Sequence, residues 1–333
     1  MIAFIGDFHS NDGVANANKN IKNGIIESKI KNQFLFSKET HPIKRIIEIF
    51  KLVYNTEKIC FSGITKVNIL IIMLAKIFKK KIYYLLHGYP AYEQSIEGVL
   101  SPKKLKQLKK NELRKYQVVD GIICVSETCA EYIKKELPRL SDKIFYINNP
   151  IDTSHWKKEK NNNRDRTAIC TTGGGRRIKN NLTIAKAVSK LNAEGYNLSL
   201  YVLGSNGPDT ELLKEENSVK YLGKHSHEDT IKLFQKTNIY IQNSYFETFG
   251  LAVLEALFNG NNLLISKNVG ARDVLENLQN SDVINDNQNI EEITEKIKNI
   301  LVNSNNRRLY NGLNQEKISP ENVAYDLYDI LKR

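Results

Sequence analysis

The fold is decided by the stretch Ile239-Tyr-Ile-Gln-Asn-Ser-Tyr-Phe-Glu-Thr-Phe-Gly-Leu-Ala-Val-Leu-Glu-Ala-Leu-Phe258, in which a short apolar run leads through a polar loop into a second apolar run. Residues 239–242 predict a strand, and residues 251–258 predict a helix. A glycine-containing loop between a strand's carboxyl end and a helix N-terminus is where α/β sheets bind phosphate. We therefore expect a diphosphate at the free backbone N–H groups of Phe249, Gly250 and Leu251, beside the positive end of the helix dipole.

Two carboxylates bracket this loop. Glu247 precedes the helix, and Glu255 lies five residues after Gly250, which is about 7.5 Å along a helix. Each carboxylate can accept paired hydrogen bonds from vicinal hydroxyls, so the pattern favours a ligand with a sugar ring on both sides of a diphosphate, a nucleotide sugar. The plainer alternative is that Glu247 is an ordinary carboxylate at a helix N-terminus and Glu255 a solvated helix residue.

Outward from this stretch, short apolar runs alternate with helical periodicity, which is typical of parallel α/β sheets. Expected strands are 2–5, 33–36, 58–61, 82–87, 121–125, 143–147, 168–172, 198–203, 219–221, 239–242 and 262–265. Expected helices are 41–54, 65–79, 102–117, 126–137 and an amphipathic C-terminal helix at 319–333. The pattern predicts two doubly wound α/β domains.

A polar segment rich in lysine and asparagine, residues 157–166, separates the two halves. Such a segment cannot bury a core, so we expect the domain boundary near residue 155. The expected domains are 1–155 on the acceptor side and 156–318 on the nucleotide-sugar side, followed by the terminal helix 319–333, which must pack on another part of the chain.

The composition bounds the class of protein. The 333 residues are 41% apolar and 26% charged, which excludes disordered, collagen-like and disulfide-scaffold proteins. The net charge of +12 favours an anionic partner. The four cysteines have no Cys-x-x-Cys or zinc spacing, so we expect no metal site and a reducing compartment. No export signal is visible, and the longest apolar stretch, 67–78, is shorter than the roughly 20 residues of a membrane span, so we expect a cytoplasmic protein.

The segment Glu247-Thr-Phe-Gly-Leu-Ala-Val-Leu-Glu255 resembles the E-x7-E signature of the retaining glycosyltransferases of family 4, the glycosyl transferases group 1 with the GT-B fold. The resemblance implies two Rossmann-like domains that face each other across a cleft and a C-terminal helix that crosses back to the first domain. It also implies metal-independent transfer with retention at the anomeric carbon. The donor would be a UDP- or GDP-linked sugar, bound as a substrate, and no cofactor is expected.

Three further segments resemble this family. Residues 168–179, AICTTGGGRRIK, correspond to its glycine-rich loop, and Arg176 and Lys179 match the positions that clasp the donor diphosphate, with Arg177 as the alternative to Arg176. The three glycines are also compatible with a simple tight turn. His87 ends an expected strand where similar enzymes have a histidine that faces the transferred sugar, although a capping or core histidine would fit the same place. Gly13 closes a loop that corresponds to the acceptor-side loop but lacks the family's Gly-Gly pair.

Two basic segments add to the positive charge. Residues 102–116 carry lysines around a stripe of leucines, and residues 77–82 carry three consecutive lysines. One interpretation is a surface for anionic lipid. The other is a solvated helix whose leucines face the protein core.

These observations favour a hexosyltransferase-type enzyme that moves a sugar from a nucleotide sugar to a saccharide or lipid-linked saccharide. Its lysine, asparagine and isoleucine content suggests a bacterial, AT-rich genome and hence surface polysaccharide or glycan synthesis. It would be cytoplasmic, or peripheral on the inner face of the cell membrane. A sugar-nucleotide epimerase of the same fold is one alternative. A basic nucleic-acid-binding protein is another, although no aromatic and basic RNA-binding motif is present.

Overall fold

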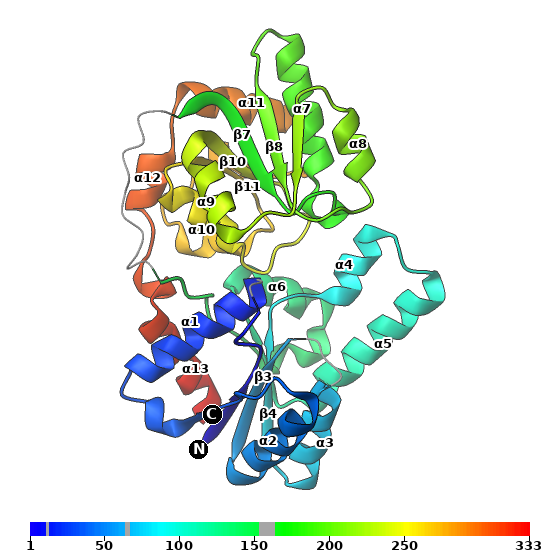
Figure 1. The fold of residues 1–333 in the computed structure, drawn as a ribbon, viewed down its shortest axis with the longest axis vertical. Helices are drawn as coiled ribbons and strands as arrows, with labels where there is room; N and C mark the ends of the chain where they lie inside the picture. The colour runs from blue at the N-terminus through cyan, green and yellow to red at the C-terminus, as the bar shows by residue number, and fades with distance from the viewer. Residues whose placement is uncertain (11–12, 64–66, 153–163) are drawn as a thin grey trace. The chain divides into compact units, whose positions relative to one another are not determined.

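The computed structural model describes residues 1–10, 13–63, 67–152 and 164–333. These residues form two compact units, each built on a parallel β-sheet (Figure 1). The first unit comprises the described residues of Met1–Tyr89, Lys106–Thr153 and Gln315–Arg333, and the second those of Pro90–Leu105 and Ser154–Asn314. The expected α/β class with two doubly wound sheets is confirmed.

The first sheet has the strand order β2-β1-β3-β4-β5-β6, and all of its strands run parallel. Its strands are β1 (Ile2–Ile5), β2 (Phe34–Phe36), β3 (Lys58–Ser62), β4 (Lys81–Leu86), β5 (Gly121–Cys124) and β6 (Ile144–Tyr146). The helices that accompany it are α1 (Gly13–Glu27), α2 (Pro42–Asn55), α3 (Val67–Ile77), most of α5 (Pro102–Val118), α6 (Glu127–Glu136) and α13 (Pro320–Lys332). The central strands are buried on both faces, as in other parallel sheets covered by helices.

The second sheet has the order β12-β11-β10-β7-β8-β9 and is also parallel. Its strands are β7 (Asp165–Thr172), β8 (Ser199–Leu203), β9 (Val219–Gly223), β10 (Thr237–Gln242), β11 (Asn262–Ser266) and β12 (Val283–Ile284). Its helices are α4 (Pro90–Glu97), α7 (Asn181–Ala193), α8 (Thr210–Glu215), α9 (His227–Lys236), α10 (Leu251–Phe258), α11 (Ile290–Val302) and α12 (Asn306–Asn311). An apolar core of Ile, Leu, Val and Ala side chains joins the sheet to α7 and α11.

The strand order of the second sheet fixes where a ligand can bind. β7 pairs with β8 on one side and with β10 on the other, and β11 lies on the far side of β10. The chain therefore continues from β7 to β8 in one direction across the sheet and from β10 to β11 in the opposite direction. Such a reversal is the topological switch point at which open α/β sheets bind ligands, beyond the carboxyl ends of the strands. The loops 173–180 and 243–250 both start there.

Most expected elements are present, and their ends differ by a few residues. The strand β12 was not expected because two residues carry too little pattern, and no ranges were expected for the helices α1, α4, α7, α8, α9, α11 and α12. The expected boundary near residue 155 lies outside the described residues. No described helix is both long and apolar enough to cross a membrane.

The C-terminal helix α13 packs against α1 within the first unit. Its first turn comes so close to α1 that a Cβ on Gly24 would lie 1.9 Å from the carbonyl oxygen of Pro320. The side chain of Lys58 donates hydrogen bonds to the last turn of the same helix, at the carbonyl of Leu331 (2.5 Å) and that of Lys332 (2.7 Å). A glycine is therefore required at position 24 for the two helices to meet.

Gly24→Ala tests this contact. In an ordinary helix interior the change stabilises by about 1 kcal/mol, but here the added methyl group must push α13 away, so we expect a loss of about 1–3 kcal/mol in the free energy of unfolding. Urea denaturation followed by circular dichroism measures it. Gly13→Ala is the control, because nothing lies within 4 Å of a Cβ at that position; equal effects of the two changes would contradict the close approach.

Candidate active site

Two of the three glycines in the loop after β7 are needed for close packing against the loop after β8 and the start of α8. A Cβ on Gly174 would lie 2.1 Å from the carbonyl oxygen of Ser205, and one on Gly175 would lie 2.1 Å from Oγ1 of Thr210. Gly174 also has a positive φ of 59°. The buried side-chain amide of Asn181 fixes this loop, because its Nδ2 donates hydrogen bonds to the carbonyls of Thr172 and Gly174. The glycines are therefore needed because the backbone here is closely packed, and not only because the loop turns tightly.

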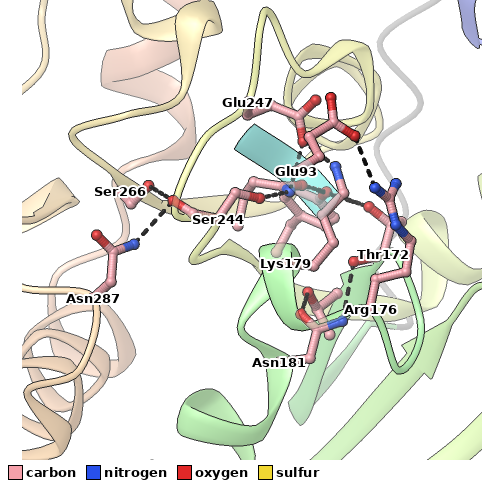
Figure 2. Close-up of polar contacts among 12 residues, drawn as sticks. Glu93, Thr172, Arg176, Lys179, Asn181, Ser244, Glu247, Ser266 and Asn287 are labelled. Atoms are coloured by element: carbon pink, nitrogen blue, oxygen red, sulfur yellow. Dashed lines mark hydrogen bonds and ion pairs between the residues drawn. The ribbon is translucent and has the colours of Figure 1, made fainter. Parts of the chain in front are cut away.

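The first glycine of this loop makes room for Lys179. A Cβ on Gly173 would lie 2.3 Å from Cγ of Lys179, and Gly173 has a φ of +98°. The lysine side chain runs through this space and forms an ion pair with Glu247, the glutamate before α10 (Figure 2). Their side chains are only 16% and 17% exposed. The structure thus joins the two sequence motifs at the switch point through one partly buried ion pair.

Glu247 is also held by a chain of polar side chains that sequence reasoning missed. Nε2 of Gln242 donates to Glu247 at 3.1 Å, and the hydroxyl of Tyr240 donates to Oε1 of Gln242. Oγ1 of Thr172 lies 2.7 Å from the Tyr240 hydroxyl, which links β10 back to β7. In the sequence, the only sign of this series of hydrogen bonds was that polar residues stand at the carboxyl ends of two adjacent strands.

The start of the loop after β10 is fixed by Asn287, a second feature that the sequence did not reveal. Its Nδ2 donates to the carbonyl of Asn243 at 2.9 Å and to that of Ser244 at 2.9 Å. Oγ of Ser266 donates to the same Ser244 carbonyl at 2.7 Å (Figure 2). Asn243, Ser244 and Ser266 are fully buried, so the backbone that carries Glu247 is rigidly supported.

The rest of this loop presents a helix start. Gly250, with a φ of +95°, is the N-cap residue of α10, and its backbone conformation favours glycine. The N–H groups of Phe249, Gly250 and Leu251 donate to no acceptor in the described part of the chain. The expected row of free amides is therefore present beside Glu247, at the positive end of the α10 dipole.

Arg176 lies among carboxylates. Its guanidinium donates to Glu93 at 2.9 Å and to Glu97 at 3.1 Å, both on α4. Glu97 is buried and also accepts from the backbone N–H of Arg177. These two carboxylates raise the pKa of Arg176 against the opposing effect of burial. The expected phosphate ligand Arg176 thus has its charge balanced within the second unit.

The alternative residue, Arg177, is engaged as well. Its Nε donates to Asp209 at 2.9 Å, and one terminal nitrogen donates to the carbonyl of Glu97 at 3.2 Å. Of the three basic residues in this loop, Lys179 is therefore the one that pairs with the E-x7-E motif itself.

Glu255, the second carboxylate of the motif, pairs with a histidine. Nε2 of His227, the first residue of α9, lies 3.0 Å from Oε1 of Glu255, and this hydrogen bond raises the pKa of His227 above its usual value. The Glu255 side chain is mostly buried, whereas that of His227 is 57% exposed. Sequence reasoning missed His227, because it lies 28 residues before its partner.

His87 belongs to the first unit, where it follows β4. Its Nε2 lies 3.2 Å from Oδ1 of Asn18, a fully buried residue of α1. Nδ2 of Asn18 donates to Oγ of Ser62 (2.8 Å) and to the carbonyl of Asp7 (3.2 Å), so its Oδ1 is an acceptor and Nε2 of His87 carries a proton. Gly13 is the exposed first residue of α1, with open space around its Cα. The expected roles of His87 and Gly13 stay predictions.

The described residues contain no group of three His, Cys, Asp or Glu side chains placed to hold a metal ion.

The fold can be compared with solved structures. Anabaena HepE, in complex with UDP and glucose, superposes with a TM-score of 0.69 at 13% identity, with 99% of each chain covered. Sucrose-phosphate synthase from Thermosynechococcus elongatus has a TM-score of 0.67 at 14% identity, covering 99% of this chain and 98% of that one. The lipopolysaccharide outer core galactosyltransferase WaaB, in its apo form, has a TM-score of 0.62 at 14% identity, with 99% of each chain covered. The chain therefore has the GT-B fold of glycosyltransferases.

A family comparison agrees with this class. Residues 152–315 match the family of glycosyl transferases group 1. No curated protein matches the chain. Residues 152–315, which include the Lys179–Glu247 pair, are thus similar to a group 1 glycosyltransferase domain, and the expected resemblance to GT-B glycosyltransferases is confirmed.

The His227–Glu255 pair predicts a pH dependence of stability. A histidine whose pKa is raised on folding stabilises fully below its unfolded value of about 6.5, and the contribution is lost as the pH rises through the raised folded value. We expect the wild type to be more stable than His227→Gln by under about 1 kcal/mol at pH 5.5, because the histidine is exposed and screened. This advantage should disappear as the pH rises through the raised folded pKa. Urea midpoints across pH measure it.

His225→Gln is the matched control, since His225 lies near the carbonyl of Gly223 and not near Glu255. A difference between wild type and His227→Gln that grows as the pH rises would contradict the pairing.

Proposed function

We propose that this protein is a metal-independent, retaining glycosyltransferase of family 4. It moves a hexose from a UDP- or GDP-linked donor to a saccharide or lipid-linked saccharide acceptor. The observation that carries the proposal is the Lys179–Glu247 ion pair, which lies at the switch point beside the free amides before α10. The complexes of Anabaena HepE with UDP and glucose, and with UDP-glucose, support a nucleotide-sugar donor.

The charges in this site fit the departure of a nucleoside diphosphate. As the glycosidic bond breaks, negative charge grows on the leaving diphosphate, and preorganised donors stabilise that charge best. Lys179 is preorganised because Gly173 and the Glu247 carboxylate together fix its side chain. The free amides of Phe249, Gly250 and Leu251 add donors that need no rearrangement.

The two glutamates have different surroundings, and we assign them different roles. Glu255 uses Oε1 for His227, so its other oxygen is the one we assign to the ribose hydroxyls of the donor. Glu247 receives Lys179 and Gln242, so it is the carboxylate nearer the cation, and we assign it to the transferred sugar. His87 in the first unit remains our candidate for a neutral hydrogen-bond partner of a sugar hydroxyl, and Gly13 for the acceptor-side loop.

Arg176 can bind the donor diphosphate only if a phosphate oxygen replaces Glu93 or Glu97 as its partner. It holds Glu93 and Glu97 at normal hydrogen-bond distance, and Glu97 is buried. The ring of Tyr92 meets that of Phe246 edge-on, with 5.8 Å between centroids, so α4 also touches the loop of Glu247. We therefore assign Arg176 a supporting role in diphosphate binding and Lys179 the principal one.

A bacterial surface polysaccharide or glycan is the product class that we propose, made by a cytoplasmic enzyme or one bound to the inner face of the membrane. An epimerase of the same fold would bind the same donor but would yield an altered nucleotide sugar without an acceptor. A nucleic-acid-binding protein would use the net charge of +12 instead.

A panel of nucleotide sugars tests this function by thermal shift in the presence of a chelator. A ligand at 100 times its dissociation constant stabilises by about 2.7 kcal/mol, so we expect a clear shift with one UDP- or GDP-sugar and none with a random oligonucleotide at physiological salt. The shifting donor is then incubated with saccharide acceptors to detect transfer. A shift with the oligonucleotide alone would contradict the proposal, and acceptor-free conversion of the sugar would favour the epimerase.

Lys179→Ala tests the principal role. Both kcat and kcat/KM should fall by about a hundredfold or more, because one charge-stabilising donor is lost from the transition state. Lys190→Ala is the matched control, since Lys190 on α7 makes an ion pair with Glu291 at the surface. Steady-state kinetics with the donor found above measures the effect.

The double variant Lys179→Ala/Glu247→Gln separates catalysis from structure. If Lys179 only neutralised Glu247, removing the negative charge would restore activity to the level of Glu247→Gln alone. We expect the double variant to stay at or below the activity of Lys179→Ala. Rescue to the Glu247→Gln level would show that Lys179 does not act on the diphosphate.

A further inference from the structure

The helices α2 and α3 of the first unit expose an apolar ridge that the fold does not use. The two helices pack side by side (Figure 1). Eight large apolar side chains along them are between 47% and 72% exposed. They are Ile43, Ile46, Ile47, Phe50 and Tyr54 on α2, and Ile69, Met73 and Ile77 on α3. We call this set the α2–α3 ridge.

Helix geometry shows that the ridge is a continuous face. On α2 its members recur at spacings of three, four and seven residues, so they form one stripe, while Ile49, Leu52 and Val53 on the opposite face are buried in the protein. On α3 they recur every four residues. Aromatic rings join the helices, since Phe78 meets Phe50 and Tyr54 edge-on at 5.6 Å and 5.4 Å. An apolar surface of this extent is unusual on a soluble protein and marks a binding face.

The charges around the ridge indicate the kind of partner that it binds. Lys44 and Lys51 lie together on one flank of the α2 stripe, and Lys76 and Lys79 lie beside the α3 stripe, all of them exposed. Glu48 is the single acidic residue of the two helices. Its carboxylate accepts hydrogen bonds from the backbone N–H groups of residues 38 and 39, at 2.8 Å and 3.1 Å, outside the ridge. An apolar stripe with a lysine margin matches the interface of an anionic bilayer, with acyl chains below and phosphates above.

A second copy of the chain fits this face less well. In a symmetric dimer the same patch meets itself, which would bring the lysine margins of both copies together, and the one acidic residue of the two helices, Glu48, is already bonded to backbone N–H groups. The basic helix α5 is a different kind of surface. Its lysines at 103, 104 and 106 are exposed, but Leu105 and Leu108 are half-buried, so α5 lacks an apolar face of comparable size.

We propose that the α2–α3 ridge docks the protein on an anionic lipid bilayer, with its apolar side chains at the level of the headgroups and its lysines on lipid phosphates. This docking goes beyond the proposed transfer reaction and does not depend on it. It would place a lipid-linked acceptor within reach of a protein without a spanning helix among its described residues.

Vesicle co-sedimentation of the full chain tests the docking. The wild type should bind vesicles of phosphatidylglycerol and phosphatidylcholine in equal parts, and bind pure phosphatidylcholine far less. I47Q/F50Q/M73Q should lower the affinity by about tenfold or more, and K44Q/K51Q/K76Q by roughly a hundredfold at low salt. Both variants should keep the wild-type donor-induced thermal shift. K44Q/K51Q/K76Q should also keep the wild-type melting temperature, whereas I47Q/F50Q/M73Q should melt slightly lower because it loses the contact of Phe50 with Phe78.

Two matched controls separate the ridge from the general charge and hydrophobicity. L212Q/V302Q removes exposed apolar side chains of the second unit, and K103Q/K104Q/K106Q removes the same amount of charge from α5. Both should bind vesicles as the wild type does. Loss of binding in the α5 variant with full binding in the ridge variants would overturn the proposal, as would absence of vesicle binding by the wild type.

A fluorescent probe reports insertion directly. The chain has a single tryptophan, so F50W in a W156F background places one reporter on the ridge. Its emission should shift to the blue with the mixed vesicles and be quenched by brominated lipid, whereas L212W in the same background should not respond. An unresponsive F50W, or a ridge-dependent dimer in sedimentation analysis without vesicle binding, would show that the ridge has another partner.

Discussion

The Lys179–Glu247 ion pair is the contact on which the second unit's switch point depends. It joins the loop after β7 to the loop after β10, which leave their sheet in opposite directions. Because both side chains are about five-sixths buried, removing one partner would leave a poorly solvated charge, an effect that reaches about 3–5 kcal/mol for fully buried pairs. A diphosphate placed against Lys179 would share this cation with Glu247. The same contact therefore holds the two loops together and positions a cation for the donor that we propose.

Buried amides make this geometry possible. Asn181 holds the glycine loop, Asn287 holds the loop of Glu247, and Asn305 bonds both the N–H and the carbonyl of Leu263 on β11. An amide both donates and accepts, so one side chain can satisfy two backbone groups that no strand or helix pairs. Buried loops of this kind would otherwise leave unpaired polar groups. The asparagine content, which from the sequence suggests only genome composition and a polar linker, has a structural use here.

The parts of the fold and site that were predictable are the local ones. Strand β1 and helix α10 lie at the residues that periodicity indicates, because a buried parallel strand and an apolar helix after a Gly250 cap each leave a pattern within a few residues. The proximity of Lys179 to Glu247 follows from the strand order, which the family resemblance supplies and periodicity does not. Partners distant in sequence were not predictable: Glu93 and Glu97 precede Arg176 by about 80 residues, and helix α4 lies in the second unit although it follows the first unit's β4.

The surface also shows which features could not be predicted from the sequence. Charge is visible in a sequence, so the lysines of α5 suggested a lipid surface, but the burial of an apolar side chain is decided by its neighbours. Leu105 and Leu108 of α5 are half-buried, whereas α2 carries two apolar faces, of which the fold covers only the one with Ile49 and Val53. Amphipathic periodicity alone cannot separate these cases, because both helices contain enough apolar residues for a core-facing stripe. The uncovered face of α2, and not the more basic helix, is therefore where the physical argument for membrane docking lies, since lysines alone hold a protein near a bilayer but apolar side chains anchor it.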